Sequence, residues 1–184
     1  MDVLNIHERE LEADPAAVGA LIDSLSARED RLWPKHAWPR MAFDRPLGVD
    51  ARGGHGPIRY VVEAYTPGRS IRFRFTGPKR FDGFHGYEVA RGRSESSIVL
   101  RHTLKMTTHG LAMVSWPLVY RPMHDALLED SLTLAQASLG LPPDIRPWSL
   151  WVKMLRWGVS GGKPVPQGVP GASRQGAAET RHNQ

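Results

Sequence analysis

Histidine is the residue type in this sequence with the widest capacity for chemistry, and four histidines stand in segments that one folded interior can unite. His55 lies in a glycine-rich stretch, His85 and His102 lie in predicted strands, and His124 lies in a predicted helix. Imidazole serves as a general acid or base near neutral pH and is a common metal ligand. The alternative interpretation is that each imidazole is a buried polar group with one hydrogen-bonding partner.

The spacing of these histidines gives little support for a metal site. The sequence has no His-Glu-x-x-His motif and no similarly spaced pair, so an ion would need ligands from four separate elements. Cysteine is absent from the sequence, which excludes thiolate ligands, disulfides and cysteine nucleophiles. We therefore predict no bound metal and no cofactor.

If the chain is an enzyme, we expect proton transfer on a ligand that contains a carbonyl group. His85 or His102 is the expected acid or base, and Tyr87 or Tyr60 is the expected hydrogen-bond donor. A serine nucleophile is not indicated, because Ser115 has no G-x-S-x-G context. The predicted catalytic set is therefore His85, His102 and Tyr87.

The glycine-rich stretch RGGHGP, residues 52–57, invites comparison with phosphate-binding loops. It lacks the lysine of a P-loop, and it precedes a predicted strand where a dinucleotide fingerprint would open a helix. Closely spaced glycines more often mark a bulge or a tight crossing of two backbones. In the functional alternative, the loop rims a cavity and presents His55 to a ligand.

The elements that position these residues begin with a predicted strand at 3–11 and a short helix that Asp14 caps and Pro15 starts. A hairpin is predicted from strands 58–65 and 70–76 around the turn 66–69. Its register sets an apolar face against a mostly charged one. The expected apolar pairs are Tyr60 with Phe75, Val62 with Phe73 and Ala64 with Ile71, and the expected charged pair is Glu63 with Arg72.

A second hairpin is predicted from strands 84–90 and 97–107. Alternate residues of the longer strand form an inward row that contains Leu100, His102 and Leu104. If Val89 pairs with Ile98, then His85 lies opposite His102.

The longest helical pattern covers residues 118–139, and Gly140 and Pro142 end it. Its inward stripe consists of His124, Leu127, Leu128, Ser131, Leu134, Ala135 and Ser138. The acidic residues Asp125, Glu129 and Asp130 are interpreted as the solvent side of this helix.

The order of these elements is that of the START-like (SRPBCC), or helix-grip, superfamily, and it covers residues 1–140. The segments LWPKHAWPRMAFDRPL, ARGGHGPIRY, PGRSIRFRF and DGFHGYEV resemble a bacterial subgroup of polyketide cyclase/dehydrase-like proteins. The resemblance implies an α+β fold in which a curved antiparallel sheet of about six or seven strands wraps around a long C-terminal helix. It also implies a cavity between sheet and helix that takes lipids, sterols, polyketides or aromatic compounds.

The cavity wall is predicted from the inward-facing residues of the sheet and helix. The expected ligand-binding residues are His55, Tyr60, Val62, Phe73, Phe75, Leu100, Leu104, His124, Leu127 and Ser131. A mostly apolar wall with sparse polar groups favours binding or carriage of a hydrophobic small molecule. The alternative is a cyclase, aromatase or dehydratase-like enzyme, and a third possibility is an interaction protein with an incidental cavity.

Charge is concentrated in the last part of the chain. The sequence carries a net charge of +5, and residues 141–184 hold six basic against two acidic side chains. The remainder is nearly neutral, so we predict no nucleic-acid partner. The N-terminus is charged from Asp2 and lacks the features of a signal peptide, which fits a cytoplasmic protein.

Residues 141–184 are predicted to form an extension that is disordered after about residue 160. Its tryptophan-rich part contains Trp148, Trp151 and Trp157 with Lys153 and Arg156 between them. Such a segment can lie in a membrane interface or pack back on the domain, and packing is favoured. The oligomeric state is left open.

Overall fold

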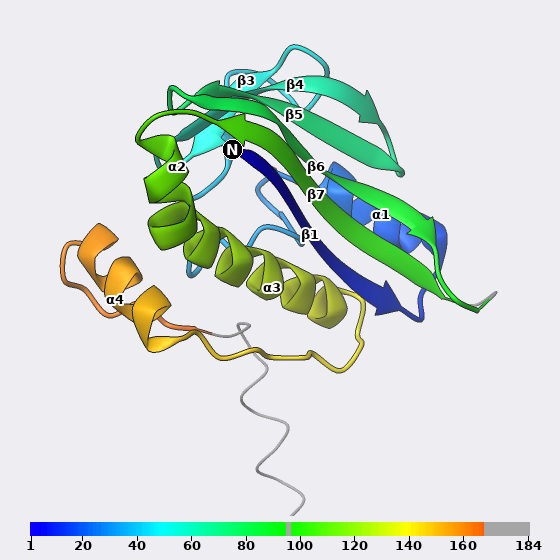
Figure 1. The fold of residues 1–184 in the computed structure, drawn as a ribbon. Coiled ribbons are helices and arrows are strands. Elements are labelled where there is room, and N and C mark those ends of the chain that lie inside the picture. Colours follow the sequence, from blue (N-terminus) through cyan, green and yellow to red (C-terminus); the bar gives the residue numbers. More distant parts are fainter. Residues whose placement is uncertain (95–96, 168–184) are drawn as a thin grey trace, which may run out of the picture.

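The computed structural model describes residues 1–94 and 97–167, and these residues form one curved antiparallel sheet that wraps around a long helix (Figure 1). The strand order is β1-β7-β6-β5-β4-β3-β2, so the first strand pairs with the last. The α+β architecture predicted from the sequence is confirmed. The strands are β1 Asp2–Leu11, β2 Ala42–Phe43, β3 Arg52–His55, β4 Ile58–Thr66, β5 Ser70–Gly77, β6 Phe81–Arg91 and β7 Ile98–Thr108.

The long helix begins earlier than its sequence pattern indicated. It consists of α2 (Ala112–Ser115), a π-helical turn η1 (Trp116–Tyr120) and α3 (Arg121–Ser138). Prolines at 117 and 122 lack the N–H that regular α-helical bonding needs, which accounts for an irregular turn at this point. The helix ends as predicted, with Gly140 in the left-handed region at φ 72°.

The first hairpin has the predicted register in the part of β4 that lies away from the turn, from Tyr60 to Val62. Tyr60 lies opposite Phe75, and Val62 lies opposite Phe73. A bulge at Glu63 adds one residue to β4, so Ala64 lies opposite Arg72, where Ile71 was expected. The Glu63 carboxylate remains on the charged face and forms ion pairs with Arg72 and Arg74.

The glycine-rich stretch becomes strand β3, which supports the structural interpretation of its glycines. A Cβ atom at Gly53 would lie 2.0 Å from the carbonyl oxygen of Ala42, so only glycine allows β2 and β3 to approach this closely. His55 ends the strand and points its ring toward Tyr60.

The predicted register of the second hairpin is wrong by two residues. Tyr87 lies opposite His102, and His85 lies opposite Leu104. The strands extend closer to the connecting loop than expected, until Arg91 pairs with Ile98. Because the error is an even number of residues, every side chain keeps its predicted face.

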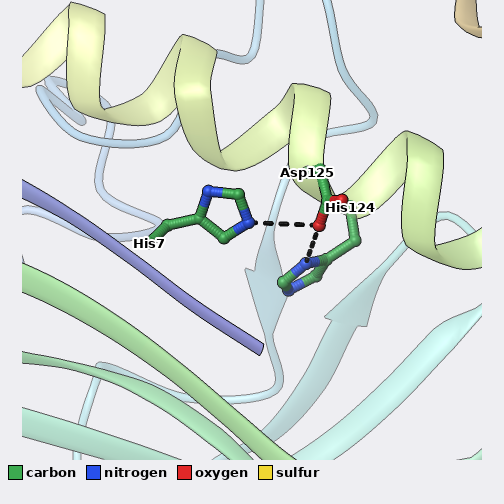
Figure 2. Close-up of side chains that lie close together, drawn as sticks. All are labelled: His7, His124 and Asp125. Carbon is green, nitrogen blue, oxygen red and sulfur yellow. Dashed lines mark hydrogen bonds and ion pairs between the residues drawn. The ribbon is translucent and has the colours of Figure 1, made fainter. Parts of the chain in front are cut away.

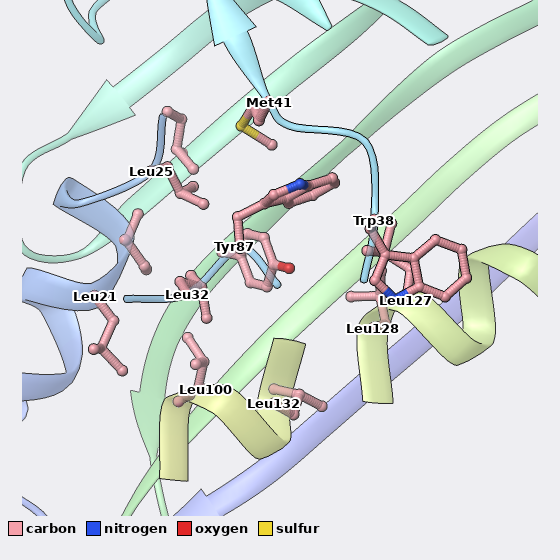
Figure 3. Close-up of a cluster of buried hydrophobic side chains, with 14 of the residues drawn as sticks. Leu21, Leu25, Leu32, Trp38, Met41, Tyr87, Leu100, Leu127, Leu128 and Leu132 are labelled. Atoms are coloured by element: carbon pink, nitrogen blue, oxygen red, sulfur yellow. The ribbon is translucent and has the colours of Figure 1, made fainter. Parts of the chain in front are cut away.

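The larger of two core clusters packs between the sheet, α3 and the first helix (Figure 3). The first helix, α1 (Pro15–Asp23), begins with the Asp14 carboxylate accepting bonds from two backbone N–H groups, as predicted. Its Leu21 packs with Leu100 of β7 and Leu132 of α3, which are all fully buried. A second, smaller core cluster includes Leu104 of β7 and Trp116 of η1, and residues of both clusters line the cavity described below.

Two acidic residues of α3 contradict the prediction that its carboxylates face solvent. Glu129 is only 18% exposed and forms ion pairs with His7 and Arg9 of β1. Asp130 is buried, and its Oδ2 atom accepts hydrogen bonds from the indole N–H groups of Trp38 at 2.7 Å and Trp148 at 3.0 Å. The carboxylate is the acceptor that two buried indoles require. Asp130 therefore joins three segments that are far apart in sequence.

The last described helix, α4 (Leu150–Val159), lies beside α3 (Figure 1). Trp148, Val152 and Arg156 are buried, whereas Trp151 and Trp157 are largely exposed. Trp148 is therefore not available for the membrane contact predicted for it, because Asp130 holds it inside. The disorder predicted for the end of the chain falls, from residue 168 onward, outside the described residues.

In the part of the chain that the structure describes, we find no helix that combines the length and apolarity needed to cross a bilayer.

Candidate functional site

A cavity of about 260 Å³ lies between the sheet and the long helix. The sheet contributes one wall, η1 and α3 contribute the opposite wall, and the loop before β2 contributes two indoles. Two residues of α4, Arg156 and Val159, complete the lining. The cavity predicted from the sequence is therefore present, although part of its wall comes from beyond residue 140.

The predicted ligand-binding residues divide into two groups. Seven of the residues named as binding or catalytic line the cavity: His55, Phe75, His85, His102, Leu104, His124 and Leu127. The other six are buried outside this lining: Tyr60, Val62, Phe73, Tyr87, Leu100 and Ser131.

Tyr87 illustrates why an inward-facing residue need not reach the cavity. Its hydroxyl lies 2.8 Å from Ser131 Oγ, and Ser131 Oγ in turn donates to the carbonyl oxygen of Leu32 at 2.8 Å. Tyr87 therefore donates to Ser131, and these two hydrogen bonds connect the sheet, the helix and the loop. Burial raises the pKa of Tyr87, so the phenol stays protonated and keeps this bond.

His85 and His102 form a buried imidazole pair in the cavity wall. Nδ1 of His85 lies 3.3 Å from Nε2 of His102, and the His85 ring stacks on Phe75 with centroids 4.9 Å apart. The remaining nitrogen of each ring has no hydrogen-bond partner among the described residues. Burial lowers the pKa of both rings, so both are neutral at pH 7.

Neutral imidazoles in this arrangement present one donor and one acceptor. If His85 Nδ1–H donates to His102, then His85 Nε2 is a bare acceptor and His102 Nδ1 carries a proton. If His102 Nε2–H donates instead, the two roles are exchanged. The pair therefore keeps one donor and one acceptor that have no partner among the described residues, and both of these nitrogens are buried.

His55 stands against aromatic rings in the cavity wall. Its Nδ1 lies 3.1 Å from the Tyr60 hydroxyl, and its ring lies 4.6 Å from that of Trp33. Burial, with smaller contributions from His124 and Arg59, lowers the pKa of His55 to about 3. His55 is therefore uncharged at neutral pH and acts as a polar point in an aromatic surface.

His124 connects the cavity to a charged network on the other side of α3. Its Nδ1 lies 3.8 Å from Asp125 Oδ1, beyond hydrogen-bonding distance, and burial lowers the pKa of His124. Asp125 Oδ1 also accepts from His7 Nε2 at 3.1 Å, and His7 Nδ1 donates to Glu129 at 2.9 Å. Although burial alone lowers it, these two carboxylates raise the pKa of His7 to about 9.

The comparisons with known proteins identify the architecture. No protein-family model matches the sequence, and no curated protein matches it. A protein from Thermobifida fusca, solved in solution, has a TM-score of 0.57 at 16% identity, over 76% of this chain and 95% of that one. The chain has the helix-grip fold. This confirms the fold expected from the sequence.

Two further structures with the helix-grip fold are relevant to the cavity. Norcoclaurine synthase from Thalictrum flavum, in complex with dopamine and hydroxybenzaldehyde, has a TM-score of 0.57 at 12% identity, over 78% of this chain and 90% of that one. The di-domain ARO/CYC StfQ from the steffimycin biosynthetic pathway has a TM-score of 0.57 at 15% identity, over 76% of this chain. The match spans about half of StfQ, 51% of its length.

Several cavity residues of this helix-grip chain were not predicted from its sequence. Trp116, Tyr120 and Leu127 lie on one face of the long helix, and their spacing of four and seven residues is the signal that could have extended the stripe backward. Trp33 and Trp38 come from an irregular loop, where no periodicity indicates direction. The sequence predicted His7 only as part of the first strand, and its contacts with Asp125 and Glu129 were not predicted.

Proposed function

We propose that this protein binds a small, largely apolar compound, such as an aromatic or polyketide-derived molecule, in the cavity between the sheet and α3. The observation that supports this function best is the composition of the cavity wall, which is formed by aromatic and aliphatic side chains around a few uncharged imidazoles and one arginine, Arg156. Such a wall gains free energy by burying apolar surface, and its sparse polar groups orient the ligand.

The size and polarity of the cavity define the ligand further. Its volume of about 260 Å³ is near the lower end of ligand pockets, which span roughly 300–1,000 Å³. This favours a compound of one or two rings over a long-chain lipid. The unpartnered nitrogens of His85 and His102 favour a ligand with a hydroxyl or carbonyl group at one edge.

Binding can be tested with 2-naphthol, a two-ring compound with one hydroxyl and its own fluorescence. Val119→Trp places an indole in the cavity, because Val119 lines it, and we expect at least a roughly tenfold loss of affinity. Val114→Trp is the matched control, since Val114 lies on α2 with its side chain exposed and outside the lining. Equal affinity in both variants would place the probe elsewhere and contradict the proposal.

Native mass spectrometry of protein purified without detergent complements the titration. A retained small molecule in the original chain, absent from Val119→Trp, is the expected result. A molecule retained equally by both proteins would show that the cavity is not where it binds.

The second candidate function is an enzyme of cyclase or dehydratase type, and the His85–His102 pair is the observation that favours it. The pair has one donor and one acceptor. These roles exchange when His85 Nε2 takes a proton from the ligand, the His85 Nδ1 proton passes along the 3.3 Å contact to His102 Nε2, and His102 Nδ1 gives its proton to the ligand. Acid–base chemistry on an enolisable ketone needs these two roles. The fold match with StfQ supports this candidate.

This candidate is tested with 2-tetralone in D₂O, by following exchange of its α-hydrogens with NMR. We expect His102→Ala to reduce protein-dependent exchange to background while 2-naphthol affinity stays within a few-fold. His109→Ala is the control, since His109 is exposed and outside the cavity lining. Exchange that is unchanged in His102→Ala would rule out the imidazole pair as acid and base.

We also propose that the exposed face of α4 contacts a membrane surface through Trp151 and Trp157. Leu150 and Met154 of the same helix are exposed beside them, and Lys153 adds positive charge. Apolar side chains next to basic ones are typical of segments that lie in an anionic lipid interface. Arg156 and Val159 line the cavity from this helix, so the contact would lie next to the ligand site.

A further inference from the structure

The network behind the cavity wall brings two imidazoles and a carboxylate together from the two ends of the domain. His7 extends from β1 toward α3, and His124 lies on the other side of the Asp125 carboxylate (Figure 2). Asp125 Oδ1 is 3.1 Å from His7 Nε2 and 3.8 Å from His124 Nδ1. One potential ligand atom from each residue lies within 4.8 Å of the other two.

These separations suit a small divalent ion. Zinc bonds to nitrogen and oxygen ligands at roughly 2.0–2.2 Å, so tetrahedral ligand atoms lie roughly 3.4 Å apart. The observed distances of 3.1 and 3.8 Å are on either side of that value. Two imidazoles with one carboxylate form a common donor set for zinc and related ions, and they leave one position open.

A second set of residues already holds these groups in place. Glu129 accepts from His7 Nδ1 at 2.9 Å, which leaves Nε2 as the nitrogen that faces Asp125. Arg9 holds the other oxygen of Glu129 at 2.8 Å, and Asn5 donates to Asp125 at 2.9 Å. A carboxylate behind a histidine is the arrangement that orients metal-binding imidazoles in known sites.

The burial of His124 without a hydrogen-bond partner is not explained by the charged network. Neither of its ring nitrogens has a hydrogen-bond partner among the described residues, although both are buried. Buried polar nitrogens are normally paired. The ring also lines the cavity, so a bound ion would stand where the network meets the ligand site.

We propose that His7 Nε2, His124 Nδ1 and Asp125 bind a divalent transition-metal ion of the zinc type, with its open position directed to the cavity. The site goes beyond the proposed ligand-binding function, because it gives the cavity a Lewis acid that can bind a ligand oxygen. It also differs from the prediction of no metal, which did not consider His7.

The test uses the full chain without an affinity tag, stripped of metal with a chelator and titrated with Co²⁺ and then Zn²⁺. We expect one equivalent of Co²⁺ to bind with the visible absorption of a low-symmetry four-coordinate site, and Zn²⁺ to displace it. His124→Ala should weaken Zn²⁺ binding by more than roughly 100-fold, whereas Glu129→Gln should weaken it by about 10–100-fold.

Two controls keep the outcome decisive. His109→Ala removes an exposed histidine outside the cluster and should leave Zn²⁺ binding unchanged. Asp125→Asn keeps the side-chain shape, and circular dichroism checks that each variant is folded. Absence of saturable one-to-one binding, or equal Zn²⁺ affinity in His124→Ala and the original chain, would overturn the proposal.

Discussion

The cavity imidazoles stay uncharged at neutral pH because burial removes the water that would solvate their protonated forms. His55 shows this most clearly, since aromatic rings and a tyrosine hydroxyl surround it, and no carboxylate of the described residues lies within hydrogen-bonding distance. A neutral ring can accept or donate one hydrogen bond without attracting water or anions. The neutral imidazoles of the cavity wall are therefore compatible with an apolar ligand.

The low pKa of His55 predicts an acid sensitivity that can be measured. The unfolded chain binds a proton here below about pH 6.5, whereas the folded chain does so only near pH 3. The contribution of neutral His55 to the free energy of unfolding is therefore complete above pH 6.5. It is lost progressively as the pH falls from 6.5 toward 3. Between pH 6.5 and 5 the loss from this residue is about 2 kcal/mol, from about 1.4 kcal/mol per unit.

His55→Gln removes this titration and should flatten the pH dependence. Urea unfolding of both proteins at pH 7.5 and pH 5 measures the effect, and the difference between their unfolding free energies should narrow or reverse at pH 5. A difference that is the same at both pH values would show that His55 is not neutral when folded.

At the scale of elements, α3 works on two faces. Its inner face closes the cavity. Asp130, on the side of the helix, accepts hydrogen bonds from Trp38 in the loop before β2 and from Trp148 in the segment before α4. Arg156 strengthens the same junction, because its guanidinium lies 4.6 Å from the centre of the Trp38 ring and bonds to the carbonyl of Ala37. Asp130 is thus one of the contacts that position α4.

Asp130→Ala tests this dependence, because it leaves two buried indole N–H groups without an acceptor. Each such donor costs about 1–3 kcal/mol, so we expect unfolding to become easier by roughly 3 kcal/mol in total. Hydrogen exchange in α4 should also accelerate. Asp130→Asn keeps an acceptor oxygen and should retain most of the stability and the protection. Equal effects of the two substitutions would show that the acceptor is not what holds α4.

At the scale of the whole molecule, positive charge and exposed tryptophans occur together in the C-terminal part of the sequence. Residues 141–184 hold six basic and two acidic side chains, and Trp151 and Trp157 are exposed on α4. The division into a ligand-binding domain at 1–140 and an extension stays a prediction. In the described residues the extension nevertheless supplies part of the cavity wall.

The membrane contact can be measured by co-sedimentation with vesicles of phosphatidylcholine, with and without phosphatidylserine. We expect binding to the anionic vesicles that weakens at high salt, and at least a roughly tenfold loss when Trp151 and Trp157 are both replaced by Ser. Leu4→Ser is the control, because Leu4 is 66% exposed on β1, away from α4. Equal binding by all three proteins would contradict the proposed contact.

Local sequence patterns were sufficient for the elements and their faces. Gly140 marked the end of the long helix. The turn at 66–69 predicted the pairing of Tyr60 with Phe75, which is correct only because the bulge at Glu63 offsets a one-residue shift at the turn, where Thr66 lies opposite Ser70. The second hairpin shows the limit of this reasoning, because a shift of two residues leaves the same side chains on the same face. Alternation alone could not decide whether His85 lies opposite His102 or Leu104.

By itself, the sequence determined a helix-grip order of elements with an apolar inner face, because helix and strand periods are properties of neighbouring residues. Only the tertiary structure decided which inward residues line the cavity and which, like Tyr87, are closed into the core. It alone brought His7 to Asp125 and Trp148 to Asp130. Such contacts depend on how segments from distant parts of the sequence pack together. Local hydrophobic periodicity contains no information about that packing.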